Sequence, residues 1–80
     1  METKNLTEDL NKILGITHVL PFDDTIAIDF DERKFVGNFT EETMLHEIKK
    51  SVYRNGFNMI TTKKTKRKKF ITLIPLRNGN

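Results

Sequence analysis

The sequence predicts an α+β fold: two helices packed on a three- to four-stranded, mainly antiparallel sheet, in the order α-β-β-α-β-β, ending in a β-hairpin with a basic tip. Two segments carry apolar residues at helical spacing, and four are rich in β-branched and aromatic residues or alternate with period 2. The chain has 80 residues, enough for one small core. We therefore expect a single domain over residues 1–76 and a flexible tail over residues 77–80.

The first predicted helix precedes Gly15. Asn5 can cap its start, and Gly15 can adopt the left-handed conformation that ends a helix. A helix this short is barely stable alone in water, so it must dock on the rest of the chain. One apolar stripe, at i, i+4, i+7 and i+8, would make that contact: Leu6, Leu10, Ile13 and Leu14.

A connecting segment and two strands are predicted next. Residues 16–23 are expected to be a connection, in which Pro21 keeps the preceding residue extended. Thr25 to Phe30 alternates with period 2, as a half-buried strand does. Residues 31–34 are predicted to turn, and residues 35–39 to form a second, weaker strand.

The second predicted helix has the strongest signals. Thr40 is a suitable N-cap, and the acids that follow it favour the positive end of a helix. Asn55 and Gly56 end the helix. Its inward stripe is predicted at Leu45, Ile48 and Val52, flanked by Met44 and Tyr53.

A β-hairpin should close the fold, with strands at 57–62 and 70–76. A two-residue turn at Thr65-Lys66 would pair Ile60 with Ile71 and Asn58 with Leu73 on one face. Both faces of this hairpin are substantially apolar, yet two short helices cover only one face of such a sheet. We therefore expect a symmetric homodimer through the uncovered face or its edge strand. In the alternative, the first helix crosses to the second face and the chain stays monomeric.

Charge is distributed very unevenly. Residues 1–47 contain all eleven acids and four bases, whereas residues 48–80 contain ten bases and no acid. This asymmetry indicates a polyanionic or acidic partner, or pairing of one half of the chain with the other. The absence of cysteine excludes disulfides and cysteine-based zinc sites. With no signal-peptide pattern and no long apolar run, we expect a cytoplasmic protein without membrane contact.

Six of the seven residues from 63 to 69 are cationic, which predicts a nucleic-acid interface. Lysine and arginine displace the counterions of nucleic acid, and a β-ribbon fits a duplex groove. Duplex is favoured over single strand, because no aromatic residue interrupts the run. The alternatives are an acidic protein surface, or a solvated tip that prevents aggregation of the apolar strand after it. The predicted nucleic-acid-binding residues are Lys63, Lys64, Lys66, Arg67, Lys68 and Lys69, extended by Lys49, Lys50 and Arg54 of the second helix.

The sequence predicts no enzyme, cofactor or metal. Asp29 and Asp31 lie on one strand face, about 6.6 Å apart, so a metal-dependent nuclease is a remote alternative. His18 and His46 are isolated from further metal ligands. Ser51, the only serine, lies inside a helix and lacks a nucleophile elbow. We therefore predict a small nucleic-acid-binding or accessory module, with a protein-interaction module (an inhibitor or a subunit of a complex) as the alternative.

Overall fold

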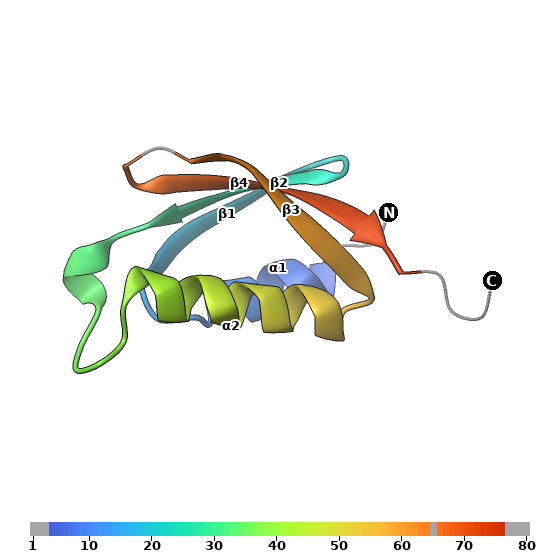
Figure 1. Ribbon diagram of the computed structural model, residues 1–80. Coiled ribbons are helices and arrows are strands. Elements are labelled where there is room, and N and C mark those ends of the chain that lie inside the picture. Colours follow the sequence, from blue (N-terminus) through green and yellow to red (C-terminus); the bar gives the residue numbers. More distant parts are fainter. Residues whose placement is uncertain (1–3, 65, 77–80) are drawn as a thin grey trace.

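A computed structural model describes residues 4–64 and 66–76, the side chains of residues 62–64 excepted. Its two layers are a twisted sheet and a pair of helices (Figure 1). The predicted tail at residues 77–80 lies outside the described residues. In chain order the elements are α1 (Lys4–Asn11), β1 (Ile16–Phe22), β2 (Thr25–Phe30), the short 3-10 helix η1 (Glu32–Lys34), α2 (Glu41–Arg54), β3 (Phe57–Lys64) and β4 (Lys68–Pro75).

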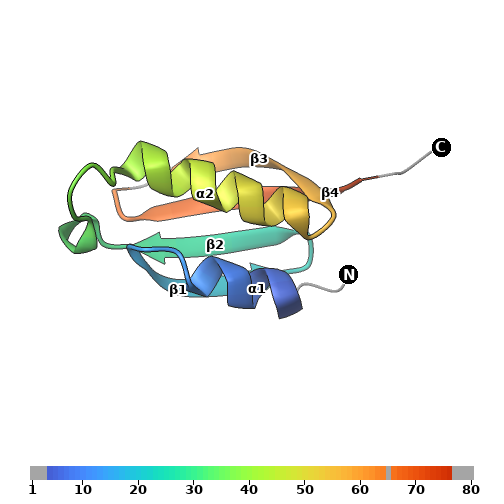
Figure 2. The ribbon, with the colours of Figure 1, turned by 90° about the horizontal axis from the view of Figure 1, so that it is seen from below.

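The sheet has four antiparallel strands in the order β1-β2-β4-β3. Each half of the chain contributes one αββ unit, and the inner strands β2 and β4 come from different units. Both helices lie on the same side of the sheet, α1 under β1 and β2 and α2 under β3 and β4 (Figure 2). The predicted α+β class, with two helices and an antiparallel sheet, is confirmed. The alternative in which the first helix crosses to the second face is wrong.

The prediction of a connection at residues 16–23 is wrong, because residues Ile16–Phe22 form the edge strand β1. Most of β1 is exposed; Ile16 is buried and Val19 half-buried. An edge strand with one thinly covered face does not need a clear apolar alternation. Pro21 is compatible with the edge, where one side of the strand needs no ladder hydrogen bond.

The strand predicted at residues 35–39 is also wrong. Phe35 caps η1 with its backbone N–H, which donates to the Glu32 carbonyl, and Gly37 has a φ of +59°. The Phe35 and Phe39 rings lie 5.4 Å apart and pack against the core. The aromatic residues that suggested a strand are therefore anchors of a loop.

Helix α2 forms as predicted, from the Thr40 cap to the stop at Asn55. The Thr40 hydroxyl accepts from the Thr43 backbone N–H at 3.3 Å. Ile48 and Val52 are fully buried, whereas Leu45 is only half-buried and Met44 takes its place in the buried stripe. Helix α1 ends at Asn11, before the predicted Gly15 stop, and buries Leu6 and Leu10.

The predicted register of the final hairpin is wrong by one residue. Ile60 pairs with Thr72, and Met59 pairs with Leu73, because the register shifts between Thr61 and Lys63. A one-residue slip moves every side chain to the other face. The core therefore lies between the helices and the inward positions of the sheet, and its fully buried members include Leu6, Leu10, Ile26, Ile28, Phe30, Met44, Ile48, Val52 and Ile71.

Candidate functional site

The base of the basic hairpin lies beside the acidic end of β2. Asp29 pairs with Lys68 in the β2–β4 ladder, and the Phe30 backbone N–H donates to the Arg67 carbonyl at 3.0 Å. Antiparallel pairing thus brings together two segments of opposite charge that lie far apart in the sequence. The charge asymmetry indicated, as one alternative, that the two halves of the chain pair with each other, and such pairing occurs here.

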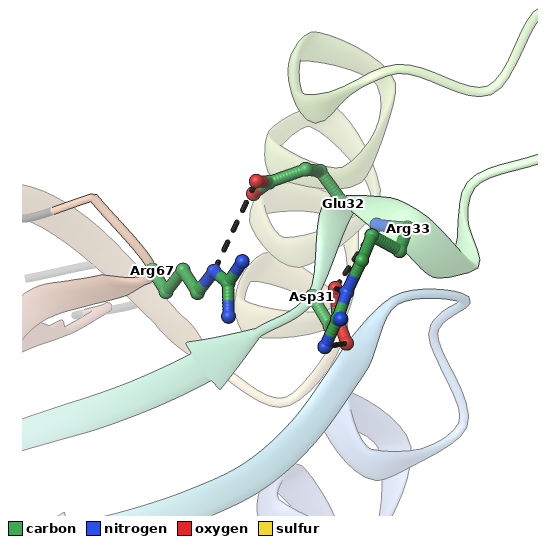
Figure 3. Close-up of polar contacts among 4 residues, drawn as sticks. All are labelled: Asp31, Glu32, Arg33 and Arg67. Atoms are coloured by element: carbon green, nitrogen blue, oxygen red, sulfur yellow. Dashed lines mark hydrogen bonds and ion pairs between the residues drawn. The ribbon is translucent and has the colours of Figure 1, made fainter.

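Two of the cations at this junction form ion pairs. Arg67 Nε lies 3.9 Å from Glu32 Oε1 (Figure 3), and Lys68 Nζ lies 3.4 Å from Asp29 Oδ1. An exposed pair such as Arg67–Glu32 contributes about 0–1 kcal/mol, so it can be exchanged for a contact with another anion at little cost. The Lys68–Asp29 pair is less exposed, because Asp29 Oδ1 is buried.

Lys69 differs from its neighbours in the run. It is 3 % exposed, and its Nζ lies 2.9 Å from Glu41 Oε2 in the first turn of α2 and 5.6 Å from the Phe30 ring centroid. Lys69 points to the helix side of the sheet and ties β4 to α2. Although Lys69 was predicted to bind nucleic acid, its ammonium is buried against Glu41 and does not lie on the exposed surface of the hairpin.

Asp31 is held by Arg33 in a closed local pair (Figure 3). The Arg33 guanidinium donates to both carboxylate oxygens, Nε to Oδ1 at 3.0 Å and Nη2 to Oδ2 at 2.9 Å, and the Arg33 backbone N–H donates to Oδ1 at 3.0 Å. These side-chain bonds, followed by the backbone bond, lower the pKa of Asp31 from 3.8 to about 2. Asp31 therefore caps η1, and both of its carboxylate oxygens already accept hydrogen bonds from Arg33.

We expect Arg33→Ala to raise the pKa of Asp31 from about 2 towards its ordinary value of 3.8, as measured by NMR titration of the carboxyl carbon. Arg67→Ala is the matched control, because Arg67 makes only the weakest contribution to this pKa, and the Asp31 titration should barely move. The lowered pKa means that the pair stabilises the fold fully above about pH 4, and that this contribution disappears as the pH falls through about 2. An Asp31 pKa that stays near 2 in Arg33→Ala would contradict this assignment.

A shallow hollow of about 500 Å³ lies on the same end of the sheet. Asp29 and Asp31 both line it, as their spacing predicted, together with His18, whose Nδ1 lies 3.9 Å from Asp29 Oδ2. Asp29 Oδ1 is buried without a hydrogen-bond donor, and Lys68 Nζ at 3.4 Å is its ion-pair partner. Among the described residues, no group of three or more acidic or histidine side chains is arranged to hold a metal ion.

The cations of α2 are arranged separately from this junction. Lys49 and Lys50 line a groove of about 360 Å³ that α2 shares with β3, and Lys50 Nζ lies 3.6 Å from Glu47. Arg54 lies one helical turn after Lys50, 3.9 Å from Asp9 of α1, and donates to the Ser51 hydroxyl. Lys50 and Arg54 are each paired with a carboxylate, Glu47 and Asp9.

None of the elements in the described part of the chain covers the sheet face away from the helices (Figure 2). Its members are the outward positions of the four strands, and four are large apolar side chains between 40 % and 59 % exposed: Leu20, Phe22, Ile60 and Ile74. The sequence predicted an uncovered apolar face but not the contribution of β1 to it. The alternation of His18, Leu20 and Phe22 is the pattern that could have predicted this strand, but residues 16–23 were expected to be a connection. We call these outward positions the open face: His18, Leu20, Phe22, Thr25, Ala27, Asp29, Asn58, Ile60, Lys68, Phe70, Thr72 and Ile74.

No protein-family model matches this chain, and no curated protein or solved structure is significantly similar to it. None of the helices in the described part of the chain is long and apolar enough to cross a membrane. Any function must therefore be argued from the surfaces described above.

Proposed function

We propose that the protein binds the phosphate backbone of nucleic acid, duplex in preference to single strand, through the cations that the β3–β4 hairpin carries at its far end. The residues proposed for contact are Lys63, Lys64, Lys66, Arg67 and Lys68. One observation carries the proposal: the run at 63–69 has six cations, and the ion pairs that the structure describes for its side chains involve three carboxylates, those of Asp29, Glu32 and Glu41. The cations of the run thus outnumber the carboxylates described beside it, and a polyanion would neutralise this charge.

The exposure of the run supports the same proposal. Lys66 and Arg67 are exposed and Lys68 is half-buried, so these side chains can reach a ligand without unfolding any element. The ion pair of Arg67 with Glu32 is solvated, and phosphate can replace the Glu32 carboxylate at little cost. Lysine dominates the run, which favours backbone attraction over the reading of base edges.

The proposal predicts a steep dependence of affinity on salt. If about four phosphates are contacted, log affinity against log salt should fall with a slope near −3.6, from about 0.9 per contact on duplex DNA. The quadruple variant K64A/K66A/R67A/K68A should abolish binding in a gel-shift assay with single-stranded and duplex DNA and RNA at two salt concentrations. Circular dichroism should show a folded protein, because the described side chains of this set lie outside the core.

A pair of matched double variants separates local contact from general charge. K66A/R67A and K4A/K12A each remove two positive charges, the first from the hairpin and the second from α1 and the residue after it. Only K66A/R67A should weaken binding and reduce the salt slope, by about 1.8. Equal binding by the quadruple variant and the unmodified protein would refute the proposal.

A second candidate function, a protein-interaction module, is favoured by a different observation. The open face exposes Leu20, Phe22, Ile60 and Ile74 on adjoining strands, and contiguous apolar surface of this kind marks interaction sites. The two candidates are compatible, since the hairpin cations and the open face share only Lys68. Binding of a protein through the open face should be insensitive to salt, unlike binding of nucleic acid through the hairpin.

A further inference from the structure

The open face is ordered in rows across the sheet, because residues paired in an antiparallel ladder project to the same side. The row at the hairpin end is charged: His18 pairs with Asp29, and Asp29 pairs with Lys68. The row contains one carboxylate with a buried, hydrogen-bond-free Oδ1 and one ammonium 3.4 Å from it. This end of the open face therefore carries both signs of charge side by side.

The next two rows carry most of the large apolar side chains of the open face, with Lys63 paired to Phe70 in the first row and Thr25 and Thr72 inside the second. Leu20, Ala27 and Phe70 form one row, in which the small Ala27 leaves a dip between two large side chains. Phe22 and Ile60 stand at opposite ends of the next row, 59 % and 53 % exposed. The open face thus has a relief of large and small side chains as well as a charge pattern.

The alternatives to face-to-face burial are weaker. Pairing through the β1 edge would meet Pro21, which has no N–H to donate, and the β3 edge is interrupted by the register shift at Thr61 and Lys63. A nucleic acid lying across the open face would meet the Asp29 carboxylate and would find two separated phenylalanines, Phe22 on β1 and Phe70 on β4, instead of a continuous aromatic platform. A protein surface of matching relief fits the open face better.

We propose that the open face binds the same face of a second copy of this chain, about a two-fold axis parallel to the strands. Under this symmetry β2 of one copy faces β4 of the other, and β1 faces β3. Asp29 then meets the partner's Lys68, and Ala27 receives the partner's Phe70. Each of these contacts occurs twice, as an isologous interface requires, and packed sheets keep their strands within about 30° of parallel.

The other face-to-face symmetry is unfavourable. A two-fold axis across the strands would turn the charged row over the opposite end of the sheet, where Ile74 and Asn58 lie. Asp29 and Lys68 would then be desolvated against an aliphatic side chain with no opposite charge to meet, which is costly. The arrangement of charge along the strands therefore selects the strand-parallel axis.

The size of the open face sets the strength expected of the dimer. Four strands about 4.8 Å apart and rows about 6.6 Å apart, three complete and a fourth with only Asn58 and Ile74, make a face roughly 19 Å by 20–26 Å, so two copies would bury roughly 800–1,000 Å² together. Interfaces of this size lie at the lower limit of specific association. We therefore expect weak association, so that the dimer forms only in concentrated solution.

Sedimentation equilibrium of the unmodified protein between about 1 µM and 1 mM tests the association, with protein alone and no nucleic acid present. The weight-average mass should rise from 9.4 kDa towards twice that value. Phe22→Lys and Ile60→Glu should each remain at the monomer mass, because each puts a charge against an apolar partner twice in the dimer. Val36→Lys, at a loop position 68 % exposed and outside the open face, is the control and should dimerise like the unmodified protein.

Mixing the two charged variants tests the strand-parallel axis directly. In a mixed dimer the lysine of Phe22→Lys faces the glutamate of Ile60→Glu, and the second Phe22–Ile60 contact is unmodified. An equimolar mixture should therefore recover association, seen as a heterodimer by native mass spectrometry, with at least tenfold tighter binding than either variant alone. Recovery by mixing supports both the face and the axis.

The following results would contradict the proposed dimer. An unmodified protein that stays at 9.4 kDa at 1 mM would overturn the proposal, as would undiminished dimerisation of Phe22→Lys. No recovery in the mixture would overturn the strand-parallel arrangement. Because nucleic acid is absent throughout, none of these results depends on the proposed function of the hairpin, and failure of either proposal leaves the other standing.

Discussion

Replacing Ile48 with Ala is expected to lower the free energy of unfolding by about 2–5 kcal/mol. Ile48 is 0 % exposed at the centre of α2 and belongs to the same buried cluster as Ile26 and Ile28 of β2. Truncation removes three carbons from a site that is closed on all sides, and the surrounding side chains can fill the cavity only in part. In a domain this small, the loss is a large share of the total stability.

Chemical denaturation of Ile48→Ala beside Val36→Ala measures this effect. Val36 is also aliphatic, but it is 68 % exposed, and its truncation should cost less than about 0.5 kcal/mol. The melting temperature of Ile48→Ala should fall by roughly 8–40 °C, from about 4–8 °C per kcal/mol in domains of this size. A cost for Ile48→Ala as small as that for Val36→Ala would mean that α2 does not bury this face.

Replacing Gly15 with Ala is expected to cost about 2–5 kcal/mol, for two reasons that can be separated. Gly15 has a φ of +93°, where a residue with a Cβ is strained by about 1–2 kcal/mol. An added Cβ would also overlap the Phe35 ring, which lies against the Gly15 backbone. Overpacking of this kind costs about 1–3 kcal/mol more.

Gly56→Ala provides the matched comparison, because Gly56 has nearly the same φ, +90°, but nothing lies within 4 Å of the position a Cβ would take. Gly56→Ala should therefore show the backbone strain alone, about 1–2 kcal/mol. Adding Phe35→Leu should recover part of the loss in Gly15→Ala and none in Gly56→Ala, as a double-mutant cycle would report. Equal costs for the two glycines would show that the Phe35 ring moves aside freely.

The elements that could be predicted are those whose signals are local. Helix α2 contains its own cap at Thr40, its own apolar period and its own stop at Asn55, so its limits follow from the sequence. Strand β2 is buried on one face along its full length and alternates accordingly. Neither prediction depended on which other element would pack there.

The wrong predictions concern segments whose structure is determined by tertiary contacts. Strand β1 is an edge strand, mostly exposed, and its pairing with β2 outweighs its weak alternation. Phe35 and Phe39 suggested a strand but pack as loop anchors. The hairpin register depends on a shift between Thr61 and Lys63 that no turn signal announced.

The same register explains why the candidate site could be predicted only in part. The run at 63–69 and its charge are evident in the sequence. Which of its cations point outward depends on strand pairing, and pairing turns Lys69 towards Glu41 and the core. The opposite charges of the two halves of the chain indicate that acids of the first half could pair with the run, but they do not indicate which acids.

The strand order has one further consequence, which concerns long-range electrostatics. Because β1 and β2 come from the first half of the chain, and α2, β3 and β4 from the rest, the described residues up to 40 carry four bases and seven acids, a net charge of −3, and those from 41 on carry nine bases and three acids, a net charge of +6. The domain therefore has a large electric dipole moment directed across its strands. Near a polyanion, this dipole orients the domain so that its β3–β4 side faces the polyanion before any contact forms. The reach of this torque is set by the Debye length, about 8 Å at physiological ionic strength and about 30 Å in 0.01 M salt.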